Sequence, residues 1–230
     1  MKLDNVSLIC IDDLCPERAY ELLIDLNKLI SFKSTKLLCS SFNSPLSVFI
    51  PPIKGHGNYD KFVITELYKY IDTDFCMIVQ RDGFFINPES WDAQFLEYDY
   101  IGAPWGDGGV GNGGFSIRSK RLLEFVANHP LSKDPSFSFS PEDGKICSEY
   151  RHGKDGLRSF GFTDAPTDIA RKFSIEGHIP VTKETFGFHG KHTFQFNKYA
   201  LENELFSMAK AYFLRSDGAR EKDLWKNLLR

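Results

Sequence analysis

Charged side chains follow a strongly apolar segment near the middle of the chain. The segment Cys76–Val79 predicts a buried strand, and Gln80, Arg81, Asp82 and Gly83 come directly after it. In an open α/β sheet, ligands bind outside the carboxyl ends of the strands. A carboxylate there, beside a glycine that lets the backbone turn sharply, is well placed to bind a metal ion. The alternative is that Asp82 and Gly83 form only a hairpin turn between two strands.

The acidic pair Glu142-Asp143 is a second candidate, because it stands just before a predicted helix. Adjacent carboxylates in that place could complement the helix dipole. They could equally supply a general base, which has to lie within hydrogen-bond reach of the hydroxyl group that it deprotonates. The position in the sequence favours neither role over the other.

His189 is a third candidate. It follows Phe188 and precedes Gly190, an arrangement that predicts a strained and exposed turn. A single histidine is more often structural than catalytic. It could also be the second protein ligand of a metal bound at Asp82, because imidazole and carboxylate together suit a divalent ion such as Mn²⁺.

The segment Asp72-Thr73-Asp74 also has the acidic spacing of a metal motif, but it precedes the predicted strand instead of following it. Its acids should therefore lie at the amino end of the strand, opposite the predicted ligand crevice. We predict that Asp72 is a residue of a turn or helix end and does not bind metal.

Glycine is concentrated in the segment Gly106–Gly114, which leads directly into a predicted strand at Phe115–Ile117. The pattern is neither the G-x-G-x-x-G turn that opens a helix nor the phosphate loop that ends in G-K-[ST]. The segment could be a flexible surface loop. Trp105 beside it favours a binding role, because an indole ring and bare glycine backbone together offer a good face for a sugar ring.

The elements that must position these residues alternate between strands and helices. The apolar strand Val6–Ile11 ends at Asp12 and Asp13, and a helix begins at Pro16, a favoured first position. Further strands are predicted at Lys36–Cys39 and Ser47–Ile50, and a helix at Tyr59–Tyr70. This alternation predicts an α/β fold with a mainly parallel sheet flanked by helices in a single domain.

The composition narrows the range of partners. A formal net charge of −3 with both signs mixed along the chain argues against nucleic acid as a partner. No run approaches the roughly 20 apolar residues that a transmembrane segment needs. Five cysteines without a C-x-x-C pair indicate a reducing, cytoplasmic location. Residues 201–230 predict amphipathic helices, which could cover the sheet, form an oligomer contact or touch the inner face of a membrane; we favour the first.

Four segments together resemble a family of little-characterised glycosyltransferase-like proteins of the GT-A fold, a Rossmann-like sheet that binds nucleotide-sugars. The segments are Gln80–Gly83, Tyr98–Trp105, Gly111–Ser116 and Phe188–Gly190. The resemblance covers about residues 45 to 190. It implies a nucleotide-binding half at about 1–105, an acceptor and catalytic half at 106–200, and C-terminal helices at 201–230.

The resemblance also implies roles for the candidate residues. Asp82 would bridge Mn²⁺ or Mg²⁺ to the pyrophosphate of a donor, and His189 would complete the metal shell. Gln80 departs from the family's pattern, since it stands where the metal motif has its first acid. The pair Glu142-Asp143 resembles the acids that supply the base in inverting enzymes of this fold.

A donor-binding set follows from the same resemblance. Asp12 and Asp13 would lie at the nucleoside, and Gly113 and Gly114 would lie near the donor sugar and the acceptor. The other residues predicted to bind the donor are Lys54, Gln80, Arg81, Trp105 and Asn112.

The predicted function is therefore the metal-assisted, inverting transfer of a hexose from a nucleotide-diphospho-sugar. A UDP-sugar is the expected donor, and a hydroxyl group of a glycan or lipid-linked glycan is the expected acceptor. Two other classes stay open: a metal-dependent hydrolase of phosphate or sugar esters, and a non-catalytic nucleotide-sugar-binding module with a decayed metal motif. Without a metal, basic residues such as Lys54 or Arg151 would have to neutralise the phosphates.

Overall fold

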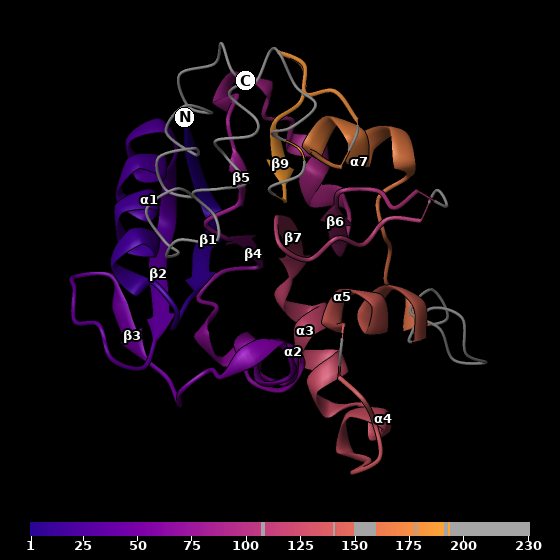
Figure 1. The fold of residues 1–230 in the computed structure, drawn as a ribbon. Coiled ribbons are helices and arrows are strands. Elements are labelled where there is room, and N and C mark those ends of the chain that lie inside the picture. Colours follow the sequence, from indigo (N-terminus) through magenta and orange to yellow (C-terminus); the bar gives the residue numbers. More distant parts are fainter. Residues whose placement is uncertain (107–108, 140, 150–159, 178, 191–192, 194–230) are drawn as a thin grey trace, which may run out of the picture.

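A six-stranded sheet organises the part of the chain that the computed structural model describes, which is residues 1–106, 109–139, 141–149, 160–177, 179–190 and 193 (Figure 1). Its strands lie in the order β3-β2-β1-β4-β7-β6. Strands β3, β2, β1 and β4 run parallel, whereas β7 is antiparallel to both β4 and β6. The mainly parallel sheet predicted from the sequence is therefore confirmed, with one strand reversed. The strand bounds are β1 (Lys2–Ile11), β2 (Ser31–Cys39), β3 (Ser47–Phe49), β4 (Phe75–Val79), β6 (Tyr100–Gly102) and β7 (Ser116–Ser119).

Both faces of the sheet are apolar, as expected for a sheet that is covered by helices on each side. Successive side chains of a strand point to opposite faces. Leu8 and Cys10 of β1 therefore belong to one core cluster, and Ile9 and Ile11 belong to another. The same alternation runs along β4, so these two neighbouring strands form the centre of both cores.

Helices cover the two faces. α1 (Pro16–Leu29) lies beside β1 and β2 (Figure 1). Proline stands at its first position, as predicted, and its apolar stripe packs on the sheet through Ala19, Leu22, Leu23 and Leu26. α2 (Gly55–Thr65) and α3 (Lys120–Asn128) pack side by side on the other face.

The predicted helix Tyr59–Tyr70 differs from the structure. α2 begins at Gly55, and the helix is interrupted at Glu66, after which the 3₁₀ turn η1 (Leu67–Tyr70) carries Leu67 into the core. The remaining short elements are η2 (Pro88–Ser90), η3 (Ala93–Glu97), α4 (Pro130–Lys133), α5 (Glu142–Gly144) and η4 (Lys145–Glu149).

A second sheet of three short strands continues from the first. Its order is β5-β9-β8, with bounds Gly83–Phe85, Gly187–His189 and Ser174–Glu176. Stacked aromatic rings hold it: Phe85 lies on Phe186 with ring centroids 5.2 Å apart. Phe173, the last residue of α7 (Thr167–Phe173), stacks on the ring of Phe115, which directly precedes β7. This packing fixes the start of β5 against the end of β9.

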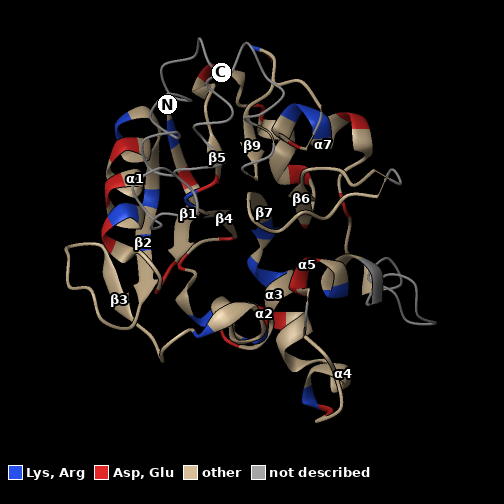
Figure 2. Ribbon diagram, in the orientation of Figure 1, with Lys and Arg blue, Asp and Glu red and all other residues tan. Residues whose placement is uncertain are grey.

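Charges of both signs are mixed over the ribbon, for example along α1 (Figure 2). Within the described ranges, no helix is both long enough and apolar enough to cross a bilayer. The helices predicted at 201–230 and the basic residue Arg151 lie outside the described residues.

Candidate functional site

The strand order creates a crevice between β1 and β4. The chain builds β2 and β3 on one side of β1 and then crosses back to place β4 on the other side. Loops that leave the carboxyl ends of β1 and β4 therefore diverge, and such switch points are where open α/β sheets bind ligands. A cavity of about 720 Å³ lies there. It is lined by twelve of the thirteen predicted site residues: Asp12, Asp13, Lys54, Gln80, Arg81, Asp82, Asn112, Gly113, Gly114, Glu142, Asp143 and His189.

Trp105 is the predicted site residue that does not line the cavity. Its ring packs on Gly111, where a Cβ atom would lie 2.6 Å from the ring atom Cη2. It also packs against the core cluster that contains Cys147. The indole therefore uses the bare glycine backbone as a packing surface within the fold, and the structure does not bring it to the donor site predicted from the sequence.

Arg81 and Asp82 form the corner of a tight hairpin. Gln80 and Gly83 exchange both backbone hydrogen bonds, at 2.8 and 3.0 Å. The turn interpretation is thus correct for the backbone, yet the Asp82 carboxylate lines the cavity and forms no hydrogen bond or ion pair with any described residue. The expected sharp turn is therefore present, although Gly83 does not reach it through a positive φ. Gly83 instead allows close packing, since a Cβ there would lie 2.6 Å from Cδ2 of His189.

The small sheet brings His189 next to this hairpin. Gly83 of β5 pairs with His189 of β9, and the Asp82 carbonyl accepts the Gly190 amide at 2.8 Å. The predicted strained and exposed turn at His189 is wrong. His189 ends a regular strand and is half-buried, and the left-handed conformation falls on Gly190, with φ of 84°.

Both ring nitrogens of His189 have partners. Nδ1 lies 3.0 Å from Oε1 of Glu176, and Nε2 donates to Oε1 of Gln80 at 3.3 Å. Burial lowers the pKa of His189, but the hydrogen bond to Glu176 and the negative charge of Asp82 outweigh this effect, so the pKa lies above its ordinary value. The apo site therefore favours an imidazolium that is held between two acceptors.

Asp82 and His189 fit a divalent metal in the type of their donor atoms. A metal-binding histidine commonly gives its other nitrogen to a carboxylate, as His189 does to Glu176. No group of three or more His, Cys, Asp or Glu side chains suited to a metal occurs in the described ranges. An ion here would therefore take its remaining ligands from phosphate oxygens and water, which is common for Mg²⁺. To bind the ion, Nε2 of His189 would have to give up its hydrogen bond to Gln80.

The acids that end β1 have structural partners. Asp12 accepts two backbone amides at the start of α1 and also accepts Nε of Arg81 at 2.6 Å. Asp13 accepts the amides of Ser40 and Ile53, which follow β2 and β3. Both side chains therefore tie the loops around the crevice together, and their predicted contact with the nucleoside stays a proposal.

Glu142 does not have the free carboxylate that a general base needs. Its two oxygens accept Nη1 and Nη2 of Arg118 at 2.7 and 2.8 Å, and both side chains are buried. The guanidinium also lies over the Tyr100 ring, 4.9 Å from the centroid. Burial raises the pKa of Glu142, and the Arg118 charge opposes that shift. The sequence offered Glu142 and Asp143 as alternatives for the base, and this geometry removes Glu142.

Asp143 is the member of the pair that is not tied to a buried base. Its Oδ2 accepts the Gly113 amide at 3.0 Å and its Oδ1 accepts the Gly144 amide at 2.6 Å, so backbone amides hold this carboxylate at the cavity wall. The glycine segment passes very close to its neighbours. A Cβ on Gly113 would lie 2.3 Å from Oε1 of Glu142, and a Cβ on Gly114 would lie 1.9 Å from Nε2 of His189.

Asn112 and Lys54 complete the predicted set. Asn112 donates to Oε2 of Glu176 at 2.8 Å and accepts the Gly114 amide at 3.1 Å, so it holds the glycine segment to β8. Lys54 is exposed just before α2, at the rim of the cavity. Asp72 lies away from the cavity and pairs with Lys36 at 2.6 Å, in agreement with its predicted place at the other end of β4.

Four polar side chains at or near the site were not predicted: His56, Tyr59, Asp60 and Glu176. His56, Tyr59 and Asp60 line the cavity from α2. Asp60 could have been found, because it shares the apolar face of the helix with Val63 and Ile64 at helical spacing. Tyr59 and Glu176 carry no comparable signal, because their contacts with Gln80 and His189 arise from tertiary structure.

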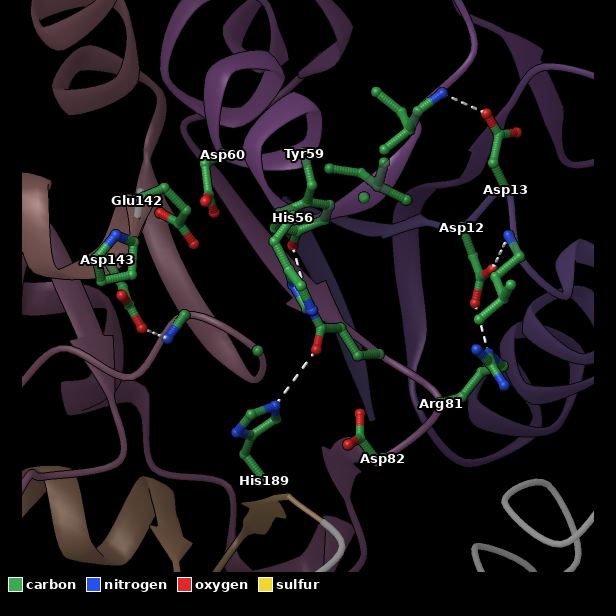
Figure 3. A pocket seen from close by; sticks show the side chains of 18 of the residues that line it. Asp12, Asp13, His56, Tyr59, Asp60, Arg81, Asp82, Glu142, Asp143 and His189 are labelled. Carbon is green, nitrogen blue, oxygen red and sulfur yellow. Dashed lines mark hydrogen bonds and ion pairs between the residues drawn. The ribbon is translucent and has the colours of Figure 1, made fainter. Parts of the chain in front are cut away.

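The pocket has two acidic sides (Figure 3). Asp12 and Asp13 stand on one side, and Asp60, Glu142 and Asp143 stand on the opposite side. Asp82 and His189 lie toward one edge between them, and His56 and Tyr59 lie centrally. A ligand that spans the cavity would therefore lie between two acidic sides, with Asp82 and His189 along one edge of it.

The model of one protein family matches residues 49–189, which is more than half of the chain, and its description is "Protein of unknown function (DUF5672)". No curated protein matches the chain. Among solved structures, the chain is similar to the crystal structure of a glycosyltransferase involved in the glycosylation of the major capsid of PBCV-1. The TM-score is 0.38 at 10% identity, over 81% of this chain and 94% of that chain. This likeness is too low to assign an activity.

Proposed function

Because the chain belongs to the DUF5672 family of proteins of unknown function, whose description names no activity, we propose its function from the pocket together with the resemblance of its motifs. It is a glycosyltransferase that moves a hexose from a UDP-sugar to a hydroxyl group of a glycan or lipid-linked glycan, with Mn²⁺ or Mg²⁺ and with inversion. The observation that carries this proposal is the Asp82 carboxylate, which lies at the switch point of the sheet and forms no hydrogen bond or ion pair with the described part of the chain.

The charge of the pocket explains why a metal belongs to the proposal. Among the described residues that line the cavity, Arg81 pairs with Asp12, and Lys54 lies exposed at the rim. Asp82 and Asp143 face the same space, and neither forms an ion pair with a lysine or arginine that the structure describes; His189 is the base whose charge they favour. A diphosphate placed among these carboxylates would be repelled, so it needs a divalent cation to bind.

The proposed chemistry follows from the geometry of these residues. An ion held by Asp82 and His189 would neutralise the charge that grows on the nucleoside diphosphate as the glycosidic bond breaks. The acceptor oxygen attacks the anomeric carbon from the opposite face, and its proton passes to Asp143. General-base help of this kind contributes about 10²- to 10⁴-fold to the rate. Arg118 and Glu142 only hold the glycine segment that separates Asp143 from His189.

The experiment that tests the proposal is calorimetric titration of the purified protein with UDP and with a panel of UDP-sugars. Each titration is run with Mn²⁺ and then with a chelator. We expect UDP to bind only with the metal, and Asp82→Asn to abolish that binding. Asp72→Asn is the matched control, because it removes an acid at the other end of the same strand and should leave binding unchanged. Equal effects of the two variants would contradict the proposed site.

Turnover separates the transferase from the other two classes. A transferase releases UDP rapidly only when an acceptor is present, whereas a hydrolase releases product with water alone. A binding module with a decayed motif shows no turnover with any acceptor; the engagement of Gln80 by Tyr59 and His189 is the feature in its favour. Loss of turnover in Asp143→Asn with UDP binding retained would support Asp143 as the base.

A further inference from the structure

Asp60 is a buried carboxylate without a structural explanation. Its residue is 6% exposed, lines the cavity, and forms no hydrogen bond or ion pair with any residue that the structure describes. It is too far along α2 to interact with the helix dipole, whose effect is confined to the first turn. Aspartate is also a poor helix-forming residue. Among the described residues, the one buried polar side-chain atom without a hydrogen-bond partner is Oγ of Ser174, so the Asp60 oxygens open onto the cavity and no contact within the described fold explains them.

No cationic side chain that the structure describes forms an ion pair with Asp60. The buried base Arg118 uses both of its terminal nitrogens to bind Glu142. The negative charge of Asp60 instead acts against the neighbouring Glu142 carboxylate. Buried carboxylates that lack internal partners and face a cavity are binding or catalytic candidates.

Asp60 lies at the end of the pocket that a donor sugar would occupy. Figure 3 shows Asp60 pointing from α2 into the space beside Glu142 and Asp143, on the side opposite Asp12. If the nucleoside lies at the ends of β1 and β4 and the diphosphate lies at Asp82, the next group of the ligand reaches the Asp60 side. This step rests on the proposed function.

We propose that Asp60 determines the specificity for the transferred sugar by accepting hydrogen bonds from its hydroxyl groups and by repelling sugars that carry an anionic substituent. The ligand class at this subsite is an uncharged hexose. A hydroxyl group is a donor that satisfies the carboxylate. A uronate would place a third negative charge beside the carboxylates of Asp60 and Asp143, and this repulsion would discriminate against acidic sugars.

The binding test compares matched donors that differ only at C6. UDP-glucose is compared with UDP-glucuronate, and UDP-galactose with UDP-galacturonate, by calorimetry with Mn²⁺. We expect the wild-type protein to favour the neutral member of at least one pair by about tenfold or more. Asp60→Asn should reduce that preference to less than about threefold and leave UDP affinity unchanged. The control variant Asp72→Asn should keep the wild-type preference. Equal affinities within both pairs in the wild-type protein would overturn the proposal.

The outcomes keep this inference apart from the proposed function. Failure of UDP itself to bind would contradict the proposed function, whereas UDP binding without discrimination between neutral and acidic sugars would contradict only the role of Asp60.

A second measurement needs no ligand. Because Asp60 has no partner among the described residues and alanine forms helices better than aspartate, Asp60→Ala should raise the melting temperature of the protein. A lower melting temperature would show that the carboxylate has a structural role, and the proposal would be withdrawn.

Discussion

Arg118 and Glu142 form an ion pair that is almost completely removed from water. The desolvation penalty of such a pair is offset only while both partners are present. Each member also holds part of the glycine segment, because Arg118 contacts the Gly113 carbonyl and Glu142 packs against Gly113. At the scale of single residues, this pair is therefore expected to affect stability before it affects chemistry.

Replacing Glu142 by Gln should lower the free energy of unfolding by about 3–5 kcal/mol, because it leaves the buried Arg118 charge without its partner. Urea denaturation measures the loss. Glu66→Gln is the control, since Glu66 forms an exposed pair with Lys69, which should contribute at most about 1 kcal/mol. Similar losses in the two variants would show that the Arg118 pair is not desolvated as the structure indicates.

The raised pKa of His189 predicts a dependence of stability on pH in metal-free protein. A histidine whose pKa rises on folding stabilises the folded state fully below its unfolded pKa of about 6.5, and this contribution is lost as the pH rises through the folded pKa. The melting-temperature advantage of the wild-type protein over His189→Gln should therefore shrink from pH 6 upward, measured with chelator.

His56→Gln is the control for this comparison, because His56 is exposed in α2. Its difference from the wild-type protein should stay nearly flat over the same pH range. An advantage of His189 that grows with pH would contradict the imidazolium held between Glu176 and Gln80.

At the residue scale, the sequence located acids by one rule, that ligands lie at the carboxyl ends of strands. The rule separated Asp82 from Asp72 and brought Asp12 into the same crevice. It could not distinguish Glu142 from Asp143, because the choice depends on Arg118, which is far from them in the sequence. The environment of a titratable group is set by tertiary contacts, and a linear pattern does not contain it.

At the scale of elements, strand β9 packs very closely against the glycine segment at Gly114. Gly114→Ala would place a methyl group 1.9 Å from the position of Nε2 of His189, so β9 or the segment has to move. We expect a loss of about 1–3 kcal/mol in the free energy of unfolding and the loss of metal-dependent UDP binding. Gly106→Ala is the control, because no atom lies within 4 Å of its Cβ position. Thermal unfolding and calorimetry of both variants test this, and equal tolerance would contradict the packing.

The elements themselves were predictable to different degrees. Strand β1 and helix α1 were predicted because long apolar runs and an initial proline leave clear signals. The strands of the small sheet were not predicted, since three residues are too few to show a period of two. The reversal of β7 was also missed, because strand direction depends on connections and not on local pattern.

For the whole molecule, ligand binding should appear as stabilisation. UDP with Mn²⁺ at about 100 times the dissociation constant should add about 2.7 kcal/mol to the free energy of unfolding. Thermal unfolding measures this stabilisation. Two control mixtures, UDP with chelator and uridine with Mn²⁺, should each raise the melting temperature much less than UDP with Mn²⁺. Equal stabilisation by UDP with chelator would mean that basic side chains such as Lys54 neutralise the phosphates without a metal.

The architecture as a whole could be predicted from alternating strands and helices, and the expected resemblance over about residues 45 to 190 coincides with the matched family at 49–189. The family's description names no activity, so the glycosyltransferase part of the resemblance stays a prediction. The arrangement of layers follows from hydrophobic periodicity, whereas an activity depends on a few side chains whose distances no periodicity fixes.

The pairing of β5 with β9 has a consequence for protein synthesis. Asp82 and His189 are separated by about a hundred residues of chain, and they meet only when β9 is added to a sheet edge that begins with Gly83. A ribosome delivers β1 to β4 first, so the nascent chain can form the crevice long before the histidine emerges. The proposed site is thus assembled last, and a chain interrupted before residue 187 would lack His189, the proposed second metal ligand.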